Sequence, residues 1–218
     1  MANNYFDMTG VLVLRQVTPV ICALFSAYNL DENHPGNGEA YIAAMSETDS
    51  SPWDSVIEEL EELAGALGAA VVPGEGAESC LSALASHFKV EGNADLLNMI
   101  EHTSFEDEAG MEQLFLLARL FDDGHGLKAY KTEAAWTCSR PRLFEFGGCG
   151  TYAGQHVHVT ASSSSAMPLG EQLDANIAAG DLDKAAEALC TDITGVLAGI
   201  YDEQTRLAVR ARLANLLA

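Results

Sequence analysis

Residues 51–68 read SPWDSVIEELEELAGALG, and this stretch is the most informative part of the chain about its fold. Ser51 can cap a helix, Pro52 suits the first turn and Asp54 can complete a capping box. Gly68 can end the helix. Six apolar residues recur at helical spacing: Val56, Ile57, Leu60, Leu63, Ala64 and Leu67. The pattern therefore predicts an amphipathic helix over residues 52–67, with glutamates on the face opposite the apolar stripe.

The elements on either side of this helix are predicted from the local period of the apolar residues. Before it, we expect strands over 5–15 and 39–47, a helix that starts at Thr18-Pro19, and a turn-rich loop over 31–38. After it, we expect helices over 78–88, 93–102 and 110–121, and then strands over 127–138, 143–147 and 151–161. The last helices are expected over 169–179, 182–200 and 203–217.

This order of elements predicts an α+β fold: a mixed or antiparallel sheet with packed helices, followed by a C-terminal helical segment. Short turns between the last strands are typical of an antiparallel meander. For a chain of 218 residues, we expect a core domain over 1–165 and a helical segment over 166–218 that packs on it.

Acidic residues dominate the charge of the chain. It has 32 Asp and Glu residues against 11 Lys and Arg, a formal net charge of −21. Residues 31–112 contain 19 acidic residues and one basic residue, Lys89. Such a field repels nucleic acids and anionic membranes and favours basic partners. A solubilising role in a structural accessory protein is the alternative interpretation of the same charge.

We expect the partner to be a basic protein, of the kind that binds nucleic acid, with no direct contact to nucleic acid or membrane. The carboxylates predicted to contact it are Glu58, Glu59, Glu61, Glu62, Glu106, Asp107 and Glu108. A homo-oligomer is also compatible with the sequence, because the arginines of residues 205–218 can pair with the acidic surface of another copy.

A small cysteine- or metal-dependent enzyme is the second hypothesis. Cys149 lies between two glycines, and His156 and His158 share one face if residues 151–161 form a strand. Cys138 and His125 are further candidate ligands. However, the chain has no CxxC or HxxxH pair, no GxSxG elbow and no phosphate-binding loop. We therefore assign no catalytic residue, no metal ligand and no cofactor.

The five cysteines form no paired motif, and no apolar run approaches the length of a membrane span. The first residues also lack the basic and apolar regions of a secretory signal. We therefore expect reduced thiols and a cytoplasmic location.

Four stretches resemble an uncharacterised group of accessory proteins from plasmids and integrative conjugative elements of proteobacteria. They are residues 9–27 (TGVLVLRQVTPVICALFSA), 33–42 (NHPGNGEAYI), 122–130 (DDGHGLKAY) and 142–148 (RLFEFGG). The resemblance implies a host-facing role, such as inhibition of a restriction or CRISPR-type defence system by acidic mimicry of DNA. It carries over no functional residue.

Overall fold

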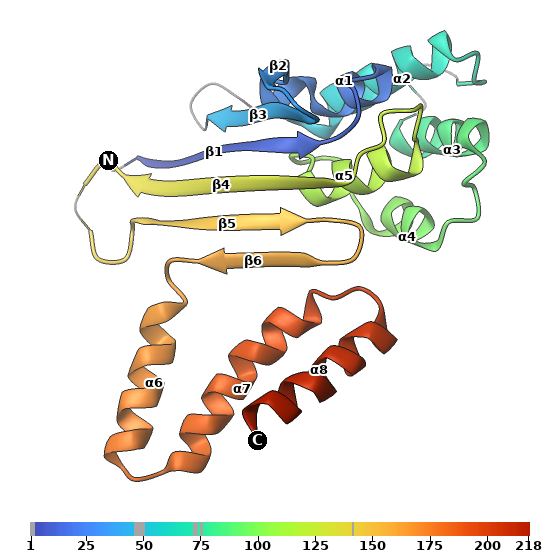
Figure 1. Ribbon diagram of the computed structural model, residues 1–218. Helices are drawn as coiled ribbons and strands as arrows, with labels where there is room; N and C mark the ends of the chain where they lie inside the picture. Colours follow the sequence, from blue (N-terminus) through green and yellow to red (C-terminus); the bar gives the residue numbers. More distant parts are fainter. Residues whose placement is uncertain (1–2, 46–50, 72–73, 75, 141) are drawn as a thin grey trace. The chain divides into compact units, whose positions relative to one another are not determined.

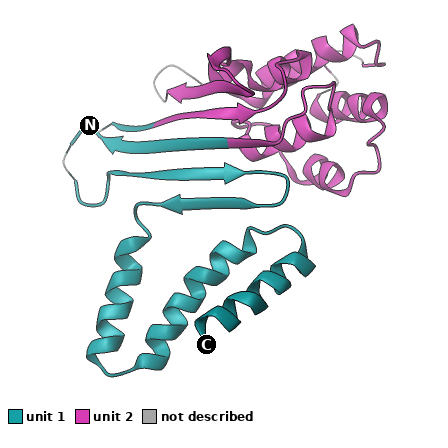
Figure 2. Cartoon of the chain, in the orientation of Figure 1, with its two compact units in different colours: residues 1–6, 131–218 teal, residues 7–130 magenta. Residues whose placement is uncertain are grey.

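The computed structural model describes residues 3–45, 51–71, 74, 76–140 and 142–218. Within these residues there are eight α-helices and six strands, and the strands pair in the order β2-β3-β1-β4-β5-β6 in an antiparallel sheet (Figure 1). The chain divides into two compact units, Asp7–Tyr130 and a second that joins Met1–Phe6 to Lys131–Ala218 (Figure 2). The predicted α+β fold with an antiparallel sheet is confirmed.

The unit Asp7–Tyr130 holds most of the buried core. Its elements are most of β1 (Asn4–Val13), α1 (Pro19–Phe25), the short 3₁₀ helix η1 (Ser26–Tyr28), β2 (Asp31–Pro35), β3 (Glu39–Met45), α2 (Trp53–Ala66), α3 (Ala77–Phe88), α4 (Ala94–His102), α5 (Met111–Leu120) and the start of β4 (Ala129–Cys138). Each of these five helices contacts the next one along the chain, from α1 to α5. Helix α5 also contacts α1.

The apolar stripes found in the sequence form this core. Leu60 of α2, Leu114 of α5 and Ile42 of β3 are fully buried, because each lies on the face that its own period turns inward. Asn93 caps α4 by accepting hydrogen bonds from the backbone N–H groups of Asp95 and Leu96, both at 3.0 Å. These contacts explain why the predicted helices of this unit appear within one or two residues of their expected bounds.

The start of α2 differs from its prediction. Pro52 is the N-cap residue and Ser51 caps nothing, because Ser51 instead pairs with a distant segment. Its carbonyl accepts from Ala109 N–H at 2.8 Å, and Trp53 N–H donates to the carbonyl of Asp107 at 3.0 Å. Residues 51–53 thus lie beside residues 107–109, held by backbone hydrogen bonds that the local sequence pattern does not reveal.

The predicted loop over 31–38 was also wrong in part, because Asp31–Pro35 forms strand β2 at the edge of the sheet. An edge strand tolerates polar side chains and a proline, since one side of its backbone needs no partner strand. The turn itself is confined to three residues with positive φ: Gly36, Asn37 and Gly38.

The second unit contains most of β4, then β5 (Gly147–Ala153), β6 (His158–Ser162), α6 (Ala166–Ala178), α7 (Leu182–Ala198) and α8 (Glu203–Leu217). The boundary of the two units therefore falls within β1 and β4, whereas the sequence suggested a boundary at residue 165. Strands β5 and β6 group with the three C-terminal helices.

Two strand predictions in this unit were wrong. Residues 143–146 precede β5, which begins at Gly147, and the expected strand 151–161 is two strands joined by a turn. That turn is closed by the hydrogen bond from Gly154 N–H to the Val157 carbonyl, 2.8 Å. Gly147 has no room for a side chain, because the Trp136 indole of β4 occupies the space that a Cβ would need. This glycine therefore allows close packing in the sheet.

Replacing Leu60 by alanine tests the interior position of the α2 stripe. We expect the free energy of unfolding to fall by about 2–5 kcal/mol, because the substitution leaves a cavity in the core. The matched control is Leu97→Ala on α4, where the leucine is 52% exposed and the expected change is within about 1 kcal/mol. Urea denaturation of both variants measures the difference, and equal losses would contradict the burial of Leu60.

Candidate functional site

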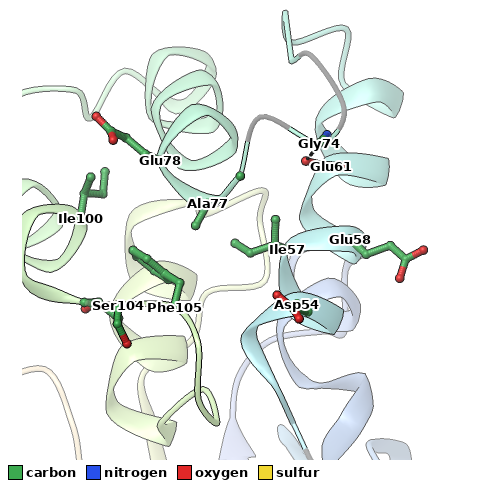
Figure 3. A pocket seen from close by; sticks show the side chains of 12 residues that line it. Asp54, Ile57, Glu58, Glu61, Gly74, Ala77, Glu78, Ile100, Ser104 and Phe105 are labelled. Atoms are coloured by element: carbon green, nitrogen blue, oxygen red, sulfur yellow. Dashed lines mark hydrogen bonds between the residues drawn. The ribbon is translucent and has the colours of Figure 1, made fainter.

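An acidic groove in the unit Asp7–Tyr130 is the candidate functional site. One face of α2 supplies Asp54, Ile57, Glu58 and Glu61, which follow one another at helical spacing. The groove has a volume of about 650 Å³. Figure 3 shows side chains that line it. Its other walls come from the start of α3 and from the end of α4 with the residues that follow: Gly74, Gly76, Ala77, Glu78, Ile100, Thr103, Ser104 and Phe105.

Carboxylates and apolar side chains share this groove. Asp54, Glu58, Glu61 and Glu78 contribute the acidic groups, and none of the described lining residues is basic. The apolar part consists of Ile57, Ala77, Ile100 and Phe105. A groove of this composition suits a side chain with an apolar stem and a cationic head, because it offers contacts to both parts.

Two contacts hold the groove in shape. The Phe105 ring packs edge-on against the buried Trp53 indole, with ring centroids 4.9 Å apart. Glu61 Oε1 accepts a hydrogen bond from Gly74 N–H at 3.1 Å, which ties the turn before α3 to α2 (Figure 3). Glu61 is half-buried, whereas Asp54, Glu58 and Glu78 are exposed and available to a partner.

The structure separates the acidic residues that the sequence grouped. Glu58 and Glu61 line the acidic groove, while Glu59 lines a second groove of about 240 Å³ formed with α1. Glu62 is exposed and lines neither of these two grooves.

The predicted residues Glu106, Asp107 and Glu108 lie outside the groove. They follow Phe105 directly and are exposed. The Glu108 carboxylate accepts a hydrogen bond from Ser51 N–H, so this residue supports the start of α2. Its role is therefore at least partly structural.

Sequence reasoning missed two groove carboxylates, Asp54 and Glu78. Asp54 precedes Glu58 by four residues and Glu61 by seven, so the helical period alone places the three on one stripe. Glu78 carries no such signal, because its approach to α2 depends on the turn between α2 and α3.

The region of Cys149, His156 and His158 does not assemble a catalytic pair. Cys149 lies in β5 opposite Ser162, whereas His158 lies in β6 opposite Ala153. Four positions along a strand separate Cys149 from His158 by roughly 13 Å, beyond hydrogen-bond reach. His156 lies in the turn before β6, so the expectation that both histidines share a strand face was wrong.

Among the described residues, one group of three side chains has metal-ligand spacing: Asp122, Asp123 and His125. Both ring nitrogens of His125 are already engaged. Leu127 N–H donates to Nδ1 at 2.9 Å, so Nε2 carries the proton and donates to the Ala118 carbonyl at 2.9 Å. Both nitrogens of this buried imidazole are therefore taken up by hydrogen bonds, and neither is free to bind a metal.

The two carboxylates of this group are occupied as well. Asp123 accepts from the Thr18 hydroxyl and from Val20 N–H, which holds the first turn of α1. Burial raises the pKa of Asp122, but hydrogen bonds from Gly124 and Gly126 N–H, together with the nearby His125 and Arg15 side chains, outweigh it, and the net shift is downward. We therefore interpret the group as a structural hydrogen-bond network.

A second test addresses this network through Asp123→Ala. Alanine has no acceptor, so both the Thr18 hydroxyl and the Val20 N–H lose their partner. We expect a loss of about 1–3 kcal/mol of unfolding free energy at neutral pH, because a backbone donor of α1 stays unsatisfied. Asp107→Ala, at an exposed carboxylate, is the control and should change stability by about 0.5 kcal/mol or less. Indistinguishable stabilities would argue against the network.

Searches of family models, of curated proteins and of solved structures return no match to this chain. Among the described residues, every helix is too short or too polar to cross a lipid bilayer.

Proposed function

We propose that this protein is a non-enzymatic interaction protein that binds a basic segment of a partner protein in the acidic groove. One observation carries the proposal: four carboxylate side chains line a groove together with apolar side chains, and none of its described lining residues is basic. An arginine or lysine side chain matches this composition, with its stem on Ile57 and Phe105 and its head at the carboxylates. Arginine can in addition stack on the Phe105 ring.

The charge of the surrounding unit supports this choice of partner. Asp7–Tyr130 contains 22 acidic and 4 basic residues, against 10 and 7 in the rest of the chain. A field of one sign accelerates the encounter with a partner of opposite charge and disfavours anionic ligands. A carboxylate-lined groove is accordingly a poor site for a nucleotide or a nucleic acid.

The class of partner follows from the same electrostatics. Proteins that bind nucleic acid present arginine and lysine where phosphates bind, so an acidic surface can compete for that site. Together with the resemblance to accessory proteins of mobile elements, this favours an inhibitor of a host restriction or CRISPR-type defence protein. Such an inhibitor would act in the cytoplasm, where its target meets foreign DNA.

Paired charge neutralisations test the groove. The test variant is Glu58→Gln/Glu61→Gln, and the control is Glu59→Gln/Glu62→Gln, which removes the same charge from the same helix outside the groove. Glutamine keeps an oxygen that can accept the Gly74 N–H, so the wall of the groove stays in place. The readout is fluorescence anisotropy with a short, labelled arginine-rich peptide.

We expect the groove variant to bind roughly 2- to 30-fold more weakly, since each exposed ion pair contributes about 0.2–1 kcal/mol. The control should lose less, and wild-type affinity should fall as NaCl rises from about 0.05 to 0.5 M. Equal losses of peptide affinity in the two variants would mean that the peptide is attracted by net charge and not bound in the groove. Either that result or an absence of binding at low salt would favour the alternative that the charge only confers solubility.

A further inference from the structure

The three C-terminal helices leave most of their apolar side chains in solvent. All residues of α6, α7 and α8 are described, yet α6 and α8 bury none and α7 buries only Ala185. The large apolar side chains left at least 37% exposed are Met167, Ile177, Leu182, Leu189, Val196, Leu207, Val209, Leu216 and Leu217. A helix in water is stabilised mainly by the packing of its apolar face. The exposed apolar side chains of α6, α7 and α8 therefore mark a surface for contact with another molecule.

Helix α7 contains the most regular of these apolar faces. Leu182, Ala186, Leu189, Ile193 and Val196 follow one another at steps of four, three, four and three residues. We call these five residues the α7 seam. A repeat that averages 3.5 residues is the pattern by which two helices pack along their length. Leu182, Leu189 and Val196 of the seam are 68%, 46% and 59% exposed.

We infer that the α7 seam is a homodimer interface, on which α7 of a second copy packs antiparallel about a two-fold axis near Leu189. The inference is independent of the proposed function, because it concerns another unit and another kind of contact. A two-fold axis lets one surface complement itself, which is the commonest way for identical chains to pair.

Charge favours a second copy as the occupant of this surface. The unit that carries α7 has a net charge of −3, from 10 acidic and 7 basic residues, while Asp7–Tyr130 has −18. Two identical chains repel least when they meet through their less charged unit. A strongly basic partner would instead be drawn to the acidic unit.

The charges on α7 also favour the antiparallel direction. In a parallel pair, the acidic first half of α7, which holds Asp183 and Glu187, would lie beside the same half of the second copy. About a two-fold axis at Leu189, that half instead lies beside residues 193–198 of the second copy, which carry no charge. The antiparallel pair thus keeps the two acidic halves apart.

The seam is long enough for a continuous helix–helix contact. Fourteen residues separate Leu182 from Val196, which corresponds to about 21 Å along the helix axis. Leu189 lies at the centre of this strip, which places the two-fold axis there.

Sedimentation velocity of the full chain tests the dimer. We expect wild-type protein at micromolar concentration to sediment at twice the 23.2 kDa chain mass, and to do so also at high NaCl. Leu189→Glu should raise the dissociation constant by about 100-fold or more, because both copies place a charge at the apolar centre. Leu97→Glu is the control, since this leucine of α4 is 52% exposed and outside the seam.

Cross-linking of the wild-type chain gives a second readout that needs no seam variant. Cys190 is exposed and next to Leu189, so the two copies of Cys190 are offset by about 3 Å along the helix axis in the antiparallel pair. A short bismaleimide should join them, and Cys190→Ser should abolish the product while the exposed Cys22 remains.

Three results would overturn the inference. The first is a protein that stays monomeric at all concentrations. If Cys190 of that monomer is also protected from maleimide, the seam is covered by the same chain. The second is a dimer that survives Leu189→Glu in a variant whose circular dichroism matches wild type. The third is a cross-link through Cys22 in place of Cys190. Failure of the peptide-binding test would leave all three readouts unchanged.

Discussion

The backbone pairing of residues 51–53 with residues 107–109 is the constraint on which the acidic unit depends. It fixes the start of α2 against the segment that leads into α5, through hydrogen bonds of 2.8 and 3.0 Å. The Trp53 indole is buried beside it and packs on Phe105. The same pairing therefore sets the direction of the acidic helix and the position of the apolar part of its groove.

This arrangement explains how a helix so rich in glutamate is stable. The buried stripe of α2, with Leu60 at its centre, supplies the favourable free energy, and the carboxylates stay in solvent where their repulsion is screened. Glu61 and Glu108 accept backbone hydrogen bonds, while Asp54 and Glu58 remain exposed at the groove. Some carboxylates thus maintain the structure and others are available for binding.

The two compact units present different physical surfaces. Asp7–Tyr130 buries its apolar residues and displays charge, whereas α6, α7 and α8 display apolar side chains and carry little net charge. The first surface suits a partner attracted by electrostatics and released by salt. The second suits an apolar contact that salt does not weaken.

The sequence by itself determined the α+β class, the acidic character and nearly all of the helices, because helical period, caps and charge are local properties. It misplaced the strands between residues 143 and 161, where glycine, threonine and histidine show no clear alternation and strand pairing decides the breaks. Only the tertiary structure decided that Glu78 joins Glu58 at a groove and that Glu59 does not. It also decided which apolar stripes stay uncovered, because burial depends on neighbours distant in sequence.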